Sequence, residues 1–128
     1  LEIVNTLIYY DVELVVMAGW MKIVTPFFIN KFKNKIINIH PSLLPAYKGG
    51  SAIKDSILNG SKITGCSVHF VEEEVDSGAL IMQAALSIRK DDDIESLSKR
   101  IQMLEHIILP HSISRAGFLI RSNFMENY

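Results

Sequence analysis

The sequence has little cysteine and no excess of charge of either sign. Its 128 residues include one cysteine, Cys66, so no disulfide can form within the chain, which suits a reducing cytoplasm. The 13 basic and 14 acidic residues give a formal net charge of −1, which offers no electrostatic reason for a nucleic-acid or anionic-membrane partner. No apolar run approaches the roughly 20 residues that span a bilayer. We therefore expect a cytoplasmic protein that binds neither nucleic acid nor membranes.

The composition is that of an ordinary globular protein. Hydrophobic residues make up 48% of the chain and charged residues 21%, which excludes disordered and fibrous classes. A chain of this length has enough apolar surface for one core and not for two. We expect residues 1–128 to form a single domain.

Strand-like and helix-like segments alternate along the chain. The apolar runs at 14–18 and 36–39 are typical of strands covered on both faces, and the segments at 66–71 and 80–84 have the pattern of further strands. Helices are predicted at residues 1–10, 26–32 (after the cap Thr25), 52–58 (after Ser51) and 94–109, with a bend or a new helical piece from Pro110 to Ile120. This order predicts an α/β fold with a Rossmann-like, mainly parallel sheet flanked by helices.

An amide and an imidazole end the second predicted strand. Asn38 and His40 are two residues apart, so their side chains lie on one face, and a proline-bounded loop closed by two glycines follows them. Such a pair can stabilise an oxyanion and move a proton. From spacing alone, structural roles are the more frequent ones, in which each side chain is bonded to nearby backbone, and only their company on one face favours catalysis.

The acidic loop at 72–78 offers a third candidate, Asp76. A carboxylate beside His40 would favour the imidazolium over the neutral ring. Glu72, Glu73 and Glu74 are typical of a solvated surface. The remaining histidines have no zinc-ligand spacing with Cys66, so we expect no metal and interpret them as structural: His69, His106 and His111.

Five motifs together resemble phosphoribosylglycinamide formyltransferase, the folate-dependent enzyme family of purine synthesis. In order they are MAGWMK (17–22), NIHPSLLP (38–45), GCSVHFV with VDSG (65–78), QAA (83–85) and LEH before Pro110. The resemblance runs from about Asp11 to Pro110. It implies the formyltransferase fold and a formyl transfer from the cosubstrate 10-formyltetrahydrofolate to glycinamide ribonucleotide, without a metal.

The resemblance also implies roles for individual residues. Asn38, His40 and Asp76 match the catalytic positions, where Asn38 stabilises the oxyanion and His40, kept cationic by Asp76, aids proton delivery to the departing folate nitrogen. Pro41 and Glu105 match family positions near glycinamide ribonucleotide. The family positions that contact the folate correspond in this chain to Met21, Lys22, Ile23, Val24, Asn38, Val71, Glu72, Glu73, Glu74 and Val75.

The chain departs from the family at its amino-terminal side. The family's glycine-rich phosphate-binding turn has no counterpart here, since Gly49-Gly50 follows the histidine, and Leu1 opens within a predicted helix. The family also has a histidine in the loop after its catalytic histidine, and this chain has another residue there, near Ser51. We therefore expect the C-terminal part of a formyltransferase domain, N-terminally truncated, whose exposed sheet edge at 14–17 allows a homo-oligomer.

Three functions remain open from the sequence. The first is the purine formyltransferase itself. The second is a formyltetrahydrofolate hydrolase or a formyltransferase of the same superfamily that acts on another amine. The third is a fragment that binds folate or associates with another subunit without catalysis.

Overall fold

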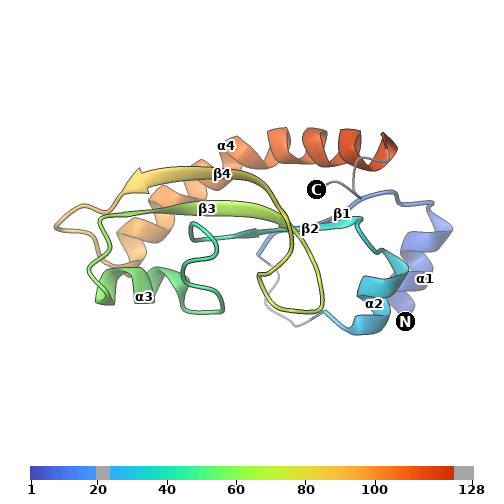
Figure 1. Ribbon diagram of the computed structural model, residues 1–128, viewed down its shortest axis with the longest axis horizontal. Coiled ribbons are helices and arrows are strands. Elements are labelled where there is room, and N and C mark those ends of the chain that lie inside the picture. Colours follow the sequence, from blue (N-terminus) through green and yellow to red (C-terminus); the bar gives the residue numbers. More distant parts are fainter. Residues whose placement is uncertain (20–23, 123–128) are drawn as a thin grey trace.

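A computed structural model describes residues 1–19 and 24–122 of the chain. In this part, helices flank a four-stranded sheet with the strand order β1-β2-β3-β4 (Figure 1). The elements in chain order are α1 (Glu2–Tyr9), β1 (Val15–Met17), α2 (Pro26–Lys31), β2 (Ile36–His40), α3 (Ala52–Leu58), β3 (Ile63–Phe70), β4 (Leu80–Ser87) and α4 (Ile94–Arg121). The predicted α/β class with flanking helices is confirmed.

The sheet is mixed, where the sequence predicts a mainly parallel one. Strands β1 and β2 are parallel, whereas β2 pairs with β3 and β3 with β4 in antiparallel registers. The β3–β4 connection at 71–79 is too short for a crossover, because a parallel pair needs a dozen or more connecting residues. Because this connection is short, the segment after β3 turns back beside the sheet.

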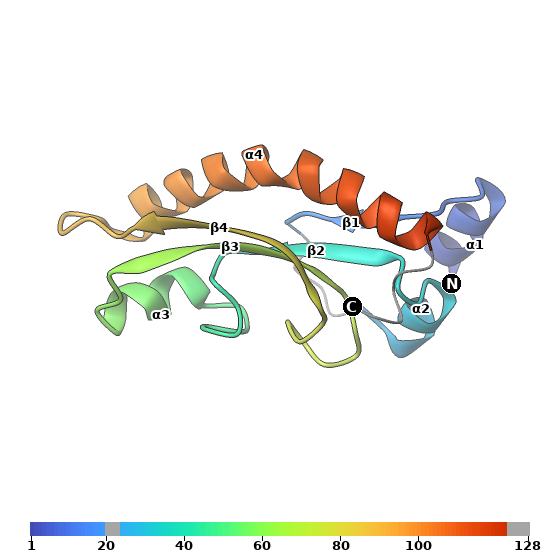
Figure 2. The same cartoon turned by 45° about the horizontal axis from the view of Figure 1, so that its top comes forward.

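One face of the sheet is covered by α4 (Figure 2). Alternate residues of β2 and β3 point to this helix and form the main core with its buried residues. These core residues include Ile37, Ile39, Cys66, Val68, Phe70, Leu97, Ile101 and Ile108. The intervening residues of the same strands therefore face the opposite side, where α3 and the two long loops lie.

Helix α4 continues through Pro110, where the sequence predicts a bend or a new helical piece. It is a single helix to Arg121 although proline lacks the N–H of an internal helical bond. Ile108 on one side of the proline and Ala116 and Leu119 on the other are all buried in the main core. Packing on both sides compensates for the lost bond.

A smaller core lies around α1 and α2. Val4, Ile29, Phe32 and Ile36 are buried together there. Helix α2 begins as predicted, with Pro26 in its first turn and the Thr25 hydroxyl accepting a 3.3 Å hydrogen bond from the backbone N–H of Phe28. This core supports the β1 side of the sheet.

Candidate active site

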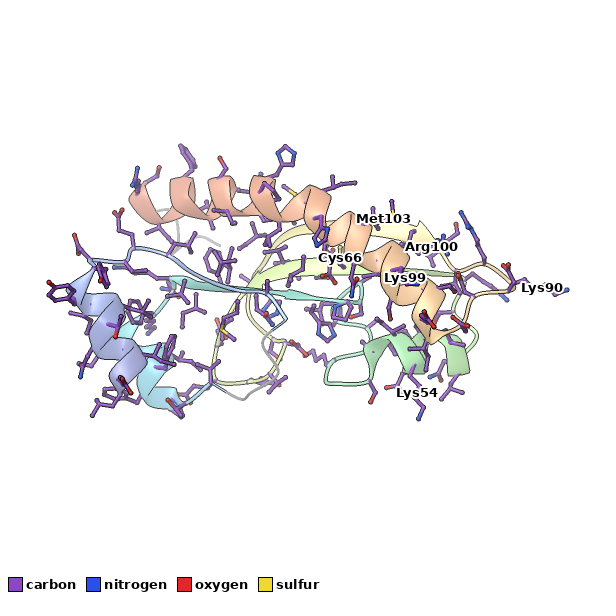
Figure 3. All side chains as sticks on the ribbon, turned by 180° about the vertical axis from the view of Figure 1, so that it is seen from behind. Lys54, Cys66, Lys90, Lys99, Arg100 and Met103 are labelled. Carbon is purple, nitrogen blue, oxygen red and sulfur yellow. The ribbon has the colours of Figure 1, made fainter. Side chains whose placement is uncertain are left out.

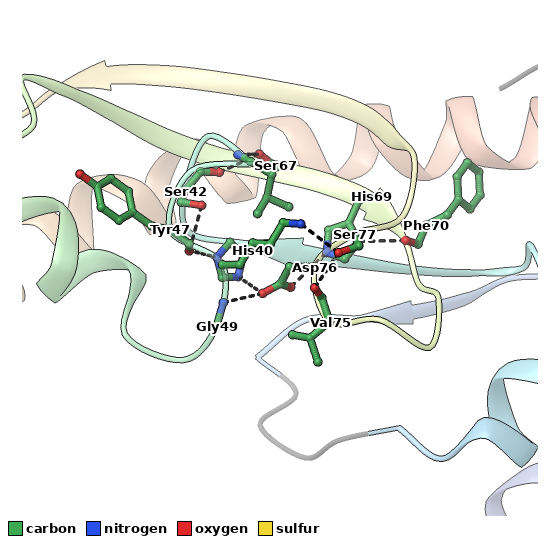
Figure 4. Close-up of polar contacts among 12 residues, drawn as sticks. His40, Ser42, Tyr47, Gly49, Ser67, His69, Phe70, Val75, Asp76 and Ser77 are labelled. Carbon is green, nitrogen blue, oxygen red and sulfur yellow. Dashed lines mark hydrogen bonds and ion pairs between the residues drawn. The ribbon is translucent and has the colours of Figure 1, made fainter.

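The pairing of β2 with β3 gathers polar side chains on the sheet face opposite α4. Asn38 is paired with His69 and His40 with Ser67. Directly opposed residues of an antiparallel pair share a face, as do residues two apart in one strand. All four side chains therefore lie on one surface, and Asp76 reaches it from the loop after β3 (Figure 4).

His40 has a partner at each ring nitrogen. Its Nε2 lies 2.8 Å from the backbone carbonyl of Tyr47, and since a carbonyl only accepts, this nitrogen donates. Its Nδ1 lies 3.4 Å from Asp76 Oδ2, and the His40 residue is 6% exposed. The nitrogen that faces the carboxylate therefore carries a proton only when the ring is an imidazolium.

Asp76 is fixed by the backbone around it. Its φ is +53°, a left-handed conformation uncommon outside glycine, and its Oδ2 accepts a 2.9 Å hydrogen bond from the Gly49 N–H. Two residues on, a Cβ at Gly78 would lie 1.7 Å from the Phe70 carbonyl oxygen, so only glycine fits there. This close approach lets the loop fold back onto His40.

Buried hydrogen bonds hold the loop that follows His40. The Ser67 hydroxyl donates to the Ser42 carbonyl at 2.7 Å and accepts from the Leu44 N–H at 3.0 Å. The Gln83 amide donates to the Leu44 carbonyl at 3.1 Å. The proline and glycine pattern of this loop does not reveal Ser67 or Gln83, because both lie far from the loop in sequence.

Asn38 offers an uncommitted amide beside this pair. It is half-buried, and its side chain makes no hydrogen bond with the residues that the structure describes. An NH₂ group in this position can donate to an oxygen that gains negative charge. Asn38, His40 and Asp76 thus lie within one neighbourhood.

His69 also belongs to this group, although the sequence pattern predicts a structural role for it. Its Nδ1 donates to the Phe70 carbonyl at 2.9 Å, while its Nε2 lies 3.6 Å from Asp76 Oδ1. Burial lowers the pKa of the ring, against the opposing effects of the Phe70 carbonyl and Asp76. The signal that could have found it is its register opposite Asn38, which a single sequence does not give.

The residues expected to contact folate are only partly described. Met21, Lys22 and Ile23 lie outside the described residues. Val24 and Val71 both pack against the smaller core, so their two segments lie together. The loop residues Glu72, Glu73, Glu74 and Val75 are exposed.

The acidic loop also borders a pocket. Glu72, Glu73 and Glu74 line it with the end of α2, and its volume is about 380 Å³. None of Asn38, His40 and Asp76 is among its lining residues. The acidic side chains therefore have their own recess beside α2.

The two residues expected near the acceptor, Pro41 and Glu105, come from distant parts of the chain. Pro41 follows His40 directly, and Glu105 lies on α4. Burial raises the pKa of the Glu105 carboxyl, with His106 and His40 acting in the opposite direction. Glu105 is therefore within electrostatic reach of His40.

Metal clusters and membrane-spanning helices are absent from the described part of the chain. Between residues 1–19 and 24–122, His, Cys, Asp and Glu side chains do not gather in threes in a way that could hold a metal ion. Within the same ranges, each helix is too short or too polar to cross a membrane.

The fold and this group of side chains together define a class. An α/β sheet that presents an amide, an imidazole and a carboxylate at one strand end is typical of enzymes that act on a carbonyl group. The family model described as Formyl transferase matches residues 1–113. The chain belongs to the formyl transferase family.

Relatives of known sequence give the same result. The chain is 50% identical over 109 residues to the trifunctional purine biosynthetic protein adenosine-3 of Chironomus tentans, covering 85% of this chain and 8% of that protein. It is 38% identical over 113 residues to the phosphoribosylglycinamide formyltransferase of Escherichia coli, covering 88% of this chain and 53% of that one.

Solved structures agree with the fold. The phosphoribosylglycinamide formyltransferase from Anaplasma phagocytophilum matches with a TM-score of 0.85 at 44% identity, over 88% of this chain and 55% of that one. The chain thus spans about half the length of the single-function relatives and a small part of the trifunctional ones.

Proposed function

We propose that this chain carries the catalytic residues of a formyltransferase that moves a formyl group from 10-formyltetrahydrofolate to the amine of glycinamide ribonucleotide, in cytoplasmic purine biosynthesis. One observation carries the proposal, the contact of His40 with Asp76 beside the uncommitted amide of Asn38. The names of the relatives support the substrates, since these proteins are purine biosynthetic proteins and phosphoribosylglycinamide formyltransferases.

Asn38 stabilises the charge that develops in the first step. The acceptor amine attacks the formyl carbon, a C–N bond forms, and the carbonyl oxygen becomes an oxyanion. Asn38 donates a hydrogen bond to this oxygen from a fixed strand position, so little reorganisation is needed when the charge appears. One such donor contributes roughly 100- to 1,000-fold in rate.

His40 and Asp76 manage the proton in the second step. The acceptor nitrogen loses a proton, and the folate nitrogen must gain one as its bond to the formyl carbon breaks. An imidazolium at His40, held by Asp76, supplies positive charge beside the oxyanion and a proton source. Because both ring nitrogens already have protein partners, this proton reaches the folate nitrogen through ordered water.

The substrate positions follow from the family resemblance. We assign the glycinamide ribonucleotide side to Pro41 and Glu105. Support for the folate side comes from Val24 and Val71, which bring two distant segments to the same small core. The proposed folate contacts are Met21, Lys22, Ile23, Val24, Asn38, Val71, Glu72, Glu73, Glu74 and Val75.

The test is release of tetrahydrofolate from 10-formyltetrahydrofolate with and without glycinamide ribonucleotide, alongside binding of a folate analogue. Release that requires the acceptor and is lost in His40→Gln supports the proposal. His111→Gln is the matched control, because His111 is an exposed histidine on α4. Release without the acceptor points instead to a hydrolase, and analogue binding without release points to a non-catalytic folate-binding fragment.

A further inference from the structure

Asp76 lies between two imidazoles. One carboxylate oxygen, Oδ2, is 3.4 Å from His40 Nδ1, and the other, Oδ1, is 3.6 Å from His69 Nε2. The side chains of Asp76, His40 and His69 are 8%, 7% and 3% exposed. Only one negative charge therefore faces two groups that can each become positive.

The two rings are locked in equivalent ways. His40 donates from Nε2 to the Tyr47 carbonyl, and His69 donates from Nδ1 to the Phe70 carbonyl. Because a neutral imidazole has one N–H, each ring then turns a lone pair toward Asp76 unless it takes up a second proton.

His69 Nε2 is an unusual atom in this arrangement. It is buried and has no hydrogen-bond partner among the described residues. A buried polar atom without a partner is unfavourable, and burial of two cations around one carboxylate is more so. One protonated ring balances the single charge of Asp76, and His69 Nε2 gains a partner only when His69 is the protonated ring.

We propose that His40 and His69 are alternative partners of Asp76, sharing one proton between them, so that His69 is a positioning residue for the proposed formyl transfer. At neutral pH the deeper ring, His69, is neutral and leaves Asp76 to His40. In acid, His69 takes a proton on Nε2, binds Oδ1 and withdraws the carboxylate from His40. The catalytic consequence rests on the proposed function.

The surroundings of the two rings agree with protonation of His40 before His69. Burial lowers the pKa of His69, and the charge of His40 acts in the same direction, whereas Asp76 raises it. From the α4 side of the sheet, Glu105 interacts with His40. From the loop after β2, Lys48 Nζ donates to Ser77 Oγ at 3.0 Å, next to Asp76.

A purely structural His69 makes a different prediction. In that case the ring serves only as a donor to the Phe70 carbonyl, and its titration is independent of His40. His69→Asn separates the two roles, because the Asn amide can still donate to this carbonyl while the titrating Nε2 is removed.

The first measurement is a ¹⁵N imidazole NMR titration of the chain, which needs a folded protein but no activity. We expect His69 to keep its proton on Nδ1 and its midpoint to move to lower pH in Asp76→Asn and to higher pH in His40→Gln. His111→Gln serves as the control and leaves the midpoint in place. A His69 midpoint that neither substitution moves overturns the proposal, whether or not the chain transfers formyl groups.

The second measurement is the ratio of kcat at pH 6 to kcat at pH 8, in which a uniform loss from damaged structure cancels. We expect this ratio to be several-fold higher in His69→Asn than in the unchanged chain. An equal ratio in the two proteins overturns the positioning role. Where neither protein turns over, the proposed function fails and the NMR titration alone decides the shared proton.

Discussion

The backbone N–H of Gly49 donates a 2.9 Å hydrogen bond to Asp76 Oδ2, across 27 residues of sequence. The same oxygen lies 3.4 Å from His40 Nδ1, so one carboxylate oxygen joins the loop after β2 to the loop after β3. The 3.0 Å bond from Lys48 to Ser77 makes a second connection between these loops. The two loops therefore orient the histidine and its carboxylate together.

Asp76→Asn tests the charge at this junction. The Asn side chain can still accept from Gly49, so we expect a similar melting temperature, but the negative charge that faces His40 Nδ1 is removed. Acid–base groups of this kind contribute roughly 100- to 10,000-fold in rate, and we expect kcat to fall within that range. The measurement is kcat with a thermal melt, with His111→Gln as the control. A folded variant that retains full turnover would contradict the role of Asp76.

Gly78→Ala tests the close approach that turns the acidic loop back. The new Cβ would lie 1.7 Å from the Phe70 carbonyl oxygen, and backbone atoms cannot rotate away as a side chain can. Overpacking of this kind lowers the free energy of unfolding by about 1–3 kcal/mol. Chemical denaturation provides the measurement, and we expect turnover to fall as well because Asp76 lies two residues away.

Gly117→Ala is the matched control for this substitution. Gly117 lies inside α4, and a Cβ there meets no atom within 4 Å. Alanine is favoured over glycine in a helix by about 1 kcal/mol, so the same chemical change should stabilise the chain. Equal effects of the two substitutions would show that the contact with Phe70 is not what requires glycine at position 78.

Side-chain alternation in one strand predicted the common face of Asn38 and His40, because a strand has a fixed period of two. The direction of β3 could not be predicted in this way. A buried run such as Cys66–Phe70 has the same composition in a parallel and an antiparallel strand. The register that sets His69 opposite Asn38 is therefore a property of the assembled sheet.

The loop geometry could not be predicted from the sequence for a related reason. Proline and glycine mark a loop, but the bonds that fix its shape come from residues far along the chain, such as Gln83 to the Leu44 carbonyl. Likewise, neither the left-handed backbone at Asp76 nor the close approach of Gly78 to Phe70 is visible in the local sequence. The resemblance supplied the grouping of Asp76 with His40, since spacing alone does not.

Cys66 should be inert in the folded chain. It lies fully buried on β3 beneath α4 (Figure 3), and burial, with Glu105 adding to it, raises the pKa of the thiol to about 11. Because the thiolate is the nucleophile, we expect iodoacetamide at pH 8 to modify Cys66 only after denaturation. Mass spectrometry of native and denatured samples measures this, and rapid labelling of the native chain would contradict the burial of the thiol.

The same thiol predicts a loss of stability in alkali. Its pKa is 9.0 in the unfolded reference and about 11 in the fold, so between these values the folded chain holds a proton that the unfolded chain has released. Stability from this group is therefore present below pH 9 and falls as the pH rises toward 11. Cys66→Ala should flatten the decline in melting temperature over this range. An unchanged slope would show that other groups cause it.

The exposed edge of β1 predicts self-association of residues 1–128. Strand β1 ends the sheet among the described residues, and Val16 on it is 37% exposed. An unpaired apolar edge is a template for another strand, and a charged side chain on it opposes such pairing. We expect light scattering after size-exclusion chromatography to show oligomers that Val16→Lys reduces. Met103→Lys adds the same charge at a 67% exposed site on α4 (Figure 3) and should leave them unchanged. If the chain is monomeric, or if both lysines reduce the oligomers equally, the edge of β1 is not the interface.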